Sequence, residues 1–324
     1  MLIDKLEKID NKIQRFDERV KFLSEPYKSL VFIKENDYGL ILLIASFLET
    51  STGLFGIISL FICNYLSRLS GIGKDDPLRK VAQYNCILTG FAAGYLLGLS
   101  LISIPAAAVS AVVSFFLTRL AGRIIENKGG SSNLLLNIPF TLTVSLLYVV
   151  FFNIIGVEQA VSTEAARYHF DFLPAFADGF ARTFGLFVFL PYDLPGAILL
   201  FCFLVTAPFA FLHAAGSFYA GVFLLSALRG FAPPDYLNIM NINFILAGLY
   251  LHSCLVCTAQ KKYLIILSAL AVCVLASDAV YAVWQSYKIP LFTLPFIISV
   301  LLVRYFLYRV KPASKAAGLS ENAA

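Results

Sequence analysis

Residues 83–90 read Gln-Tyr-Asn-Cys-Ile-Leu-Thr-Gly, and residues 241–248 read Asn-Ile-Asn-Phe-Ile-Leu-Ala-Gly. Both stretches contain the pattern Asn-x-x-Leu-x-Gly within apolar sequence. The second asparagine, Asn243, follows the first, Asn85, by 158 residues (243 − 85). A repeat of such long period determines how the rest of the chain is divided.

Other landmarks recur in the same order. Phe32 and Phe189 each stand seven residues before a glycine. Residues 137–140 read Asn-Ile-Pro-Phe, and residues 293–296 read Thr-Leu-Pro-Phe, with the two prolines 156 residues apart (295 − 139). Landmarks that recur at nearly constant spacing indicate an internal duplication.

The composition predicts an integral membrane protein. Hydrophobic residues make up 59% of the 324 residues and charged residues only 14%, whereas soluble proteins average about half apolar and a quarter charged. A spanning helix needs about 20 mainly apolar residues. Candidate spans lie within residues 39–66, 85–104, 106–120, 134–155, 194–228, 239–258, 263–283 and 290–307. Because the run at 194–228 is too long for one span, we expect an all-α polytopic fold with about ten transmembrane helices.

The charges predict how the chain is inserted. The net charge of +5 is carried by the chain ends and short loops. The positive-inside rule then places both termini in the cytoplasm, which requires an even number of spans. The linker at 157–181 is acid-rich, which suits the outer face. The first copy would therefore cross the membrane an odd number of times, and the second would be inverted, as in transporters whose path lies at the repeat interface.

These features divide the chain into five parts. Residues 1–28 form an amphipathic cytoplasmic helix, whose apolar stripe would lie on the membrane surface or form a coiled coil with a neighbouring subunit. The membrane repeats occupy residues 29–156 and 182–310. An extracytoplasmic loop at 157–181 joins them, and a cytoplasmic tail follows at 311–324.

Other functional classes receive little support. The sequence contains no basic face interleaved with aromatic residues, so we expect no nucleic-acid partner. The cysteines give no disulfide framework, and His252 with Cys254 and Cys257 has no second cluster to complete a metal site. His169 and His213 share no ligand spacing with His252, and no cofactor fingerprint occurs. We expect no metal, no cofactor and no catalysis, with a membrane-embedded enzyme as the remote alternative.

The repeated polar residues suggest a path for a solute. Pro139 and Pro295 each remove a backbone hydrogen bond, and a carbonyl freed in lipid must find a partner or face a water-filled path. Each proline would mark such an opening or a structural kink. Asn85 and Asn243 lie in apolar sequence, where an unpaired amide is costly, so we expect them to bind a broken helix end. Oxygens beside flat apolar side chains would suit a small, neutral, planar solute with N–H groups and would exclude ions.

The duplicated Asn-x-x-Leu-x-Gly segments, each followed by a Leu-Pro-Phe-like element, resemble those of the urea transporter family over residues 29–308. The resemblance implies a homotrimer with one pore per subunit and passive permeation of urea. It also implies two inverted repeats of five helices, each with a tilted half-spanning pore helix. The residues that it implies for the two hydrophobic slots are Phe32, Tyr84 and Leu88 for one and Phe189 and Leu246 for the other. Near the constriction, Asn137 and Thr293 would supply oxygens.

The chain departs from the family pattern in several places. Asn137 stands where the family usually has Thr, and Ile242 stands where an aromatic residue would precede Asn243. The Gln or Glu that usually precedes the slot phenylalanine is absent from residues 29–31 and 186–188. The resemblance as a whole still leads us to expect a urea channel of the inner membrane. The alternatives are a channel for a short amide, ammonia or water, and a closed or purely structural member.

Overall fold

The computed structural model describes residues 21–32, 36–127, 135–157, 170, 172–255, 259–285 and 292–310. Every regular element within these ranges is a helix, which confirms the predicted all-α fold. Three expected parts fall wholly or largely outside the described residues: most of the N-terminal helix at 1–28, most of the loop at 157–181, and the tail at 311–324.

The chain forms two compact units. Unit 1 comprises residues 1–212 with 236–239, and unit 2 comprises residues 213–235 with 240–324. The border does not follow the predicted repeats, because the first helices of the second copy pack within unit 1. There the Tyr38 hydroxyl donates to the Leu199 carbonyl (3.0 Å), and the rings of Tyr38 and Phe203 lie 5.0 Å apart.

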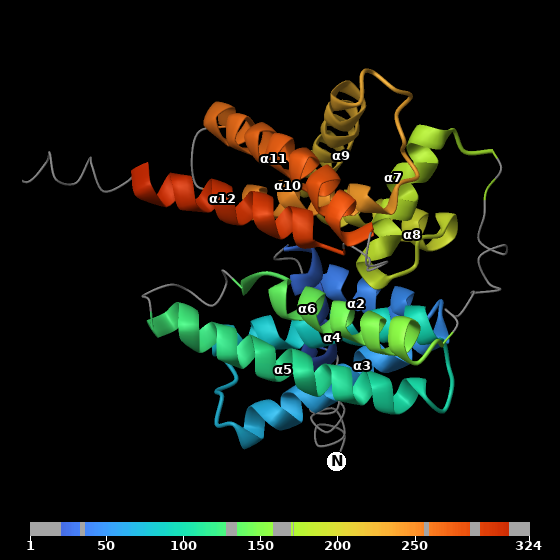
Figure 1. Cartoon of the computed structure of the whole chain (residues 1–324), viewed down its shortest axis with the longest axis vertical. Helices are drawn as coiled ribbons and strands as arrows, with labels where there is room; N and C mark the ends of the chain where they lie inside the picture. The colour runs from blue at the N-terminus through green and yellow to red at the C-terminus, as the bar shows by residue number, and fades with distance from the viewer. Residues whose placement is uncertain are drawn as a thin grey trace, which may run out of the picture. The chain divides into compact units, whose positions relative to one another are not determined.

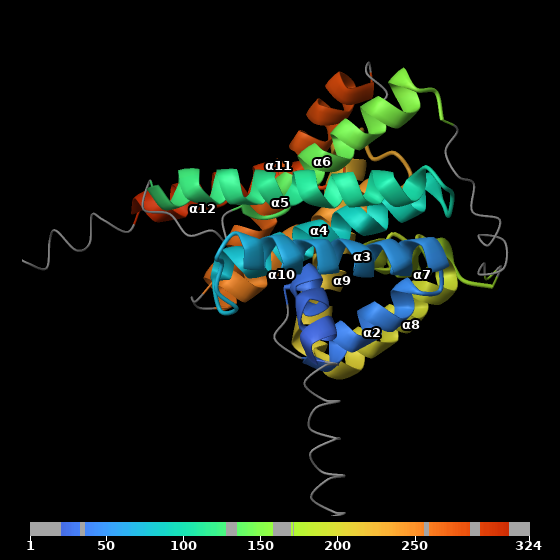
Figure 2. The same ribbon diagram turned by 90° about the horizontal axis from the view of Figure 1, so that it is seen from below.

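Unit 1 is built on three long helices, α3 (Thr50–Leu69), α4 (Pro77–Leu97) and α5 (Ser103–Asn127), which lie side by side in Figures 1 and 2. Helix α4 lies between the other two and is buried along most of its length. It starts sharply, because the Asp76 carboxylate accepts the Leu78 N–H (2.8 Å) and proline occupies the first helical position.

Beside α5 lies a shorter apolar helix, α6 (Ile138–Tyr148), which continues as the π-helix η3 (Val149–Ile154). An apolar groove of about 310 Å³ separates α5 from the α6–η3 segment. Its lining residues include Val109, Val113 and Leu146. An apolar exposed surface of this kind is consistent with helices that face lipid.

Two bent helix pairs complete unit 1, one from each copy of the duplication. In the first, residues 21–28 are helical and lead through the 3₁₀ turn η1 (Ser29–Val31) toward α2 (Asn36–Ser46). In the second, α7 (Ala175–Gly185) leads through η5 (Leu186–Val188) to α8 (Asp193–Thr206), with a bend of 87°.

The two pairs share one close approach. A Cβ on Gly39 would overlap the carbonyl oxygen of Ser24, and a Cβ on Gly196 would overlap the carbonyl oxygen of Ala181. Both the glycines and the carbonyls are 157 residues apart (196 − 39 and 181 − 24), so the duplication extends to backbone packing.

Unit 2 holds most of α9 (Pro208–Leu228), part of the 3₁₀ turn η6 (Ile239–Asn241), and the whole of α10 (Ile242–Cys254), α11 (Ala259–Gln285) and α12 (Leu294–Val310). Helix α11 packs on both α10 and α12. The packing within unit 2 also repeats the packing within unit 1. Gly248 lies against the Ser217 hydroxyl, as Gly90 lies against the Ser59 hydroxyl 158 residues earlier.

Four described helices are long and apolar enough to cross a membrane: α3, α5, α9 and the 261–282 part of α11. The bent pair α7–α8 would add a fifth, broken span. Within the overlong run at 194–228 the structure places two helices, α8 and α9, as its length predicts. Shorter apolar helices are found at residues 138–154, 239–254 and 294–307.

Candidate functional site

The first copy of the duplicated motif holds the start of a short helix. Asn85 lies on α4 and is fully buried. Its Nδ2 donates to the carbonyl oxygen of Leu136 (3.1 Å), and its Oδ1 accepts the backbone N–H of Phe140 (3.0 Å). The first N–H groups of a helix have no partner within that helix. A buried amide from another helix therefore satisfies the start of α6.

The second copy makes the same arrangement within unit 2. Asn243 on α10 is also fully buried. Its Nδ2 donates to the carbonyl oxygen of Phe292 (3.1 Å), and its Oδ1 accepts the backbone N–H of Phe296 (3.1 Å) at the start of α12. We call each of these pairs of hydrogen bonds a helix-start clamp. The equivalent bonds agree within 0.1 Å in length.

Each clamp holds a residue in an uncommon backbone conformation. Leu136 and Phe292, whose carbonyls accept the asparagine amides, have positive φ angles of 46° and 45°. A bulky residue seldom adopts this left-handed conformation, which costs about 1–3 kcal/mol unless the surroundings enforce it. The chain thus makes the same strained turn before α6 and before α12.

Asn137 and Thr293 are the last residues before these two helices. Both are buried, and their carbonyls accept the first intrahelical hydrogen bonds, from Thr141 (2.9 Å) and Ile297 (3.0 Å). The side chain of Asn137 does not cap its helix. Two polar side chains therefore occupy equivalent positions at buried helix starts.

Neither proline lies in the middle of its helix, where it would cause a break or a kink. Pro139 and Pro295 lie in the first turn of α6 and α12. Proline is well tolerated there, because the N–H that it lacks would have had no partner within the helix. The prolines therefore mark where the two short helices begin.

Phe32 and Phe189 also share a strained conformation. Each follows a 3₁₀ turn and has positive φ, 57° for Phe32 and 58° for Phe189. Both side chains are half-buried. The bent helix pairs thus present an aromatic residue at the same backbone geometry in each copy.

Aromatic contacts surround Phe189 within unit 1. Its ring centroid lies 5.9 Å from that of Phe140 and 6.1 Å from that of Tyr95. Sequence reasoning missed Tyr95. A signal for it exists, because Tyr95 lies eleven residues, or about three helical turns, after Tyr84 on the same face of α4.

The remaining predicted slot residues are buried on α4 and α10. Tyr84, Leu88 and Leu246 are 7%, 8% and 3% exposed. The Tyr84 hydroxyl donates to the Leu136 carbonyl (2.7 Å), so this carbonyl accepts from Tyr84 and Asn85 together. In unit 1 the structure thus gathers Tyr84, Asn85 and Phe189 around the start of α6.

The histidine and cysteine residues suggest no metal centre in the described part of the chain. His213 and His252 come together in unit 2, with ring centroids 3.8 Å apart, although they are distant in sequence. Among the described residues, no group of three or more His, Cys, Asp or Glu could hold a metal ion. His169 and Cys257 lie outside the described residues.

Comparison with known proteins identifies a family but no individual relative. A family model described as urea transporter matches residues 22–308, which include both copies of the duplicated motif. A search of curated proteins finds no match. The match covers most of the chain, and it contains the four described helices that are long and apolar enough to cross a membrane. The protein is therefore a multi-pass membrane protein that belongs to the urea transporter family.

Proposed function

We propose that the protein is a passive, channel-like transporter of urea in the inner membrane. Family membership supports urea transport across a membrane; the channel mechanism goes beyond it. In the proposed arrangement, residues 29–156 and 182–310 are inverted repeats that form one pore in each subunit of a homotrimer. Both termini are cytoplasmic.

The observation that carries the proposal is the repeated helix-start clamp. A helix end inside a membrane is tolerated only where protein or a water-filled path satisfies its backbone groups. Both α6 and α12 begin at buried polar residues, Asn137 and Thr293, and both starts are held by an asparagine from another helix. Half-helix ends that converge on a path are the arrangement through which many transporters bind their substrates.

Each set of residues has one role in this proposal. Phe32 with Tyr84 and Leu88, and Phe189 with Leu246, form flat apolar slots that accept a planar solute and exclude hydrated ions. Asn137 and Thr293 place oxygens where the solute has lost its water, so that its N–H groups keep hydrogen-bond partners. Asn85, Asn243, Pro139 and Pro295 support the helix starts and do not contact the solute.

A second candidate is a channel for another small neutral solute. It is favoured by two substitutions at the proposed filter. Ile242 stands in place of an aromatic face, and Asn137 stands in place of a hydroxyl and brings a larger amide with two N–H donors and a carbonyl acceptor. A short amide such as acetamide has fewer N–H groups than urea and therefore needs fewer acceptors at this position.

Stopped-flow light scattering on proteoliposomes tests the proposal. An inward urea gradient is compared with gradients of formamide, acetamide and glycerol. We expect saturable urea entry that is faster than in protein-free liposomes. Rapid entry of another solute without urea would instead establish the second candidate.

One substitution tests the slot itself. Leu88→Trp places a larger side chain at a position that is 8% exposed, so we expect urea flux to fall to the rate of protein-free liposomes while the protein still folds. Leu101→Trp is the matched control, because Leu101 is 91% exposed and should tolerate the change. Normal flux through well-folded Leu88→Trp protein would refute the slot.

A further inference from the structure

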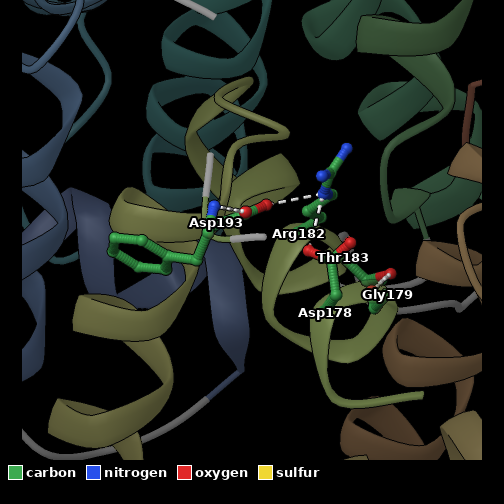
Figure 3. Close-up of polar contacts among 6 residues, drawn as sticks. Asp178, Gly179, Arg182, Thr183 and Asp193 are labelled. Atoms are coloured by element: carbon green, nitrogen blue, oxygen red, sulfur yellow. Dashed lines mark hydrogen bonds and ion pairs between the residues drawn. The ribbon is translucent and has the colours of Figure 1, made fainter. Parts of the chain in front are cut away.

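A group of three charged residues, two buried aspartates and an arginine whose side chain is 30% exposed, links the two halves of the bent pair α7–α8. The Nε of Arg182 donates to Oδ1 of Asp178 (2.7 Å) and to Oδ1 of Asp193 (2.6 Å). Figure 3 shows Arg182 between the two carboxylates. Asp178 is 6% exposed and Asp193 is 1% exposed. We call these three residues the charge clamp.

The charge clamp is a costly feature in apolar helices. Charges buried in a membrane protein are rare and usually functional, and removing one partner of a buried pair leaves an uncompensated charge. Both carboxylates lie in the first turn of their helices, where the helix dipole favours a negative charge. Asp193 also accepts the backbone N–H of Phe170. The carboxylates are thus held in place by several contacts.

The position of the charge clamp along the chain is informative. Arg182 lies near the end of α7, and Asp193 is the first residue of α8. Their ion pair therefore closes the segment between them, which turns through 87° and carries Phe189 at positive φ. The Leu190 N–H donates to the Gly185 carbonyl (2.9 Å) within this segment. The charge clamp fixes the base of the turn that presents Phe189.

The equivalent positions of the first copy hold different residue types. The positions 157 residues before Asp178, Arg182 and Asp193 hold Lys21, Glu25 and Asn36. Glu25 instead lies 3.8 Å from Lys80, and both of these side chains are more than half exposed. The equivalent positions thus lack the Asp–Arg–Asp combination, although Phe32 and Phe189 have the same positive φ.

We propose that Asp178, Arg182 and Asp193 are positioning residues that set solute selectivity by fixing the conformation of Phe189. The inference rests on the proposed channel, in which Phe189 forms one of the two slots. A rigid Phe189 keeps its slot narrow enough for a flat solute. A loosened turn lets the ring move and admits a bulkier one.

The test separates positioning from stability. Asp193→Asn removes one charge but keeps an oxygen acceptor. The triple variant Asp178→Asn, Arg182→Met and Asp193→Asn removes every charge at similar side-chain volume, so no uncompensated charge is left buried. Proteoliposome flux is measured for urea and for N-methylurea, and thermal unfolding is measured in detergent.

In Asp193→Asn we expect the ratio of urea to N-methylurea permeability to fall about fivefold, because the free-energy barriers for the two solutes become more alike. The triple variant should regain the thermal stability of the wild type but keep the lowered ratio. A stable triple variant with the wild-type ratio would overturn the inference. The ion pair of Arg229 and Asp278 in unit 2 (2.7 Å), whose side chains are 45% and 33% exposed, is the control, and Arg229→Met with Asp278→Asn should leave the ratio unchanged.

Two further arms keep the outcome decisive. Asp193→Glu preserves all charges and moves the carboxylate by one methylene group, so it tests the inference if the neutral variants do not fold; an unchanged ratio in this variant would also overturn it. Wild-type urea flux and its block by Leu88→Trp test the proposed channel separately. Failure of the charge clamp with an intact Leu88→Trp block would therefore refute only the positioning role.

Discussion

Asn85 and Asn243 make the same two hydrogen bonds to the start of a following helix, but the residues before them differ. The Tyr84 hydroxyl is a second donor to the Leu136 carbonyl, beside the Asn85 amide, whereas the Ile242 side chain has no polar group to offer the Phe292 carbonyl. The Tyr84 hydroxyl is thus a spare donor for the carbonyl of the first helix-start clamp. The residue before Asn243 supplies no such donor to the second helix-start clamp.

The packing behind the two motifs differs in a complementary way. In unit 1, Cys86 on α4 packs with Cys63 on α3 in a buried cluster. The equivalent positions, 158 residues later, hold Phe244 and Gly221, and a Cβ on Gly221 would overlap the Phe244 ring. Two medium side chains have been exchanged for one large and one absent side chain. Cores tolerate such exchanges when the total volume is kept.

The comparison indicates which constraints both copies need. Hydrogen bonds to the helix starts, positive φ at four bulky residues and close backbone approaches recur, while side-chain volumes and charges have diverged. The recurring features fix the backbone around the proposed slots. The diverged features, which include the charge clamp, are the features by which the two proposed slots can differ.

The largest expected effect comes from the close approaches at Gly39 and Gly196. Gly196→Ala places a Cβ against the Ala181 carbonyl, and Gly39→Ala places one against the Ser24 carbonyl. Backbone atoms must move in both cases, so each variant should lose about 3 kcal/mol of stability or more. Thermal unfolding in detergent measures the loss, and the two variants should lose similar amounts.

Gly216 on α9 is the matched control. A Cβ there would meet no atom within 4 Å, and alanine is favoured over glycine inside a helix by about 1 kcal/mol. Gly216→Ala should therefore be neutral or stabilising. If Gly196→Ala behaved like Gly216→Ala, the bent pair α7–α8 would be looser than its equivalent, and the common backbone constraint would be wrong.

The next largest effect on stability distinguishes the two helix-start clamps. Asn243→Ala leaves the Phe292 carbonyl and the Phe296 N–H without their amide partner, whereas Asn85→Ala leaves the Leu136 carbonyl bound to Tyr84. Each buried group left unsatisfied costs about 1–3 kcal/mol. We expect Asn243→Ala to lose about 3 kcal/mol and Asn85→Ala about 2 kcal/mol, by thermal unfolding.

Aspartate at the same positions sharpens the comparison. Its carboxylate accepts the helix N–H but cannot donate to the carbonyl. Because the Tyr84 hydroxyl also serves that carbonyl in the first clamp, Asn85→Asp should be better tolerated than Asn243→Asp. The reverse order would show that the spare donor has no energetic role.

Much of this architecture could be predicted from the sequence. The recurrence of Asn85 at Asn243 showed the duplication, and the apolar composition indicated a membrane protein. The role of the asparagines at helix ends followed from the cost of an unpaired amide in apolar surroundings. These inferences succeeded because each depends on residue type and spacing alone.

Features that depend on three-dimensional geometry could not be predicted. The pairing of Asp178 with Arg182 has the spacing of one helical turn, but the contact with Asp193 exists only because α7 and α8 meet at 87°. The sequence predicts an opening or a kink at Pro139 and Pro295, because it does not show that both prolines lie in the first turn of their helices. The roles of the slot residues stay predictions.

The smallest effect tests whether Tyr84 and Asn85 share one acceptor. Tyr84→Phe removes a 2.7 Å hydrogen bond, but the Asn85 amide still donates to the Leu136 carbonyl. The loss should be about 1 kcal/mol, and Tyr65→Phe, at a tyrosine that is 64% exposed, should cause none. Combining Tyr84→Phe with Asn85→Ala should cost more than the sum of the two changes, because only the double variant orphans the carbonyl. Strictly additive losses in thermal unfolding would mean that the Tyr84 hydroxyl is no substitute for the Asn85 amide.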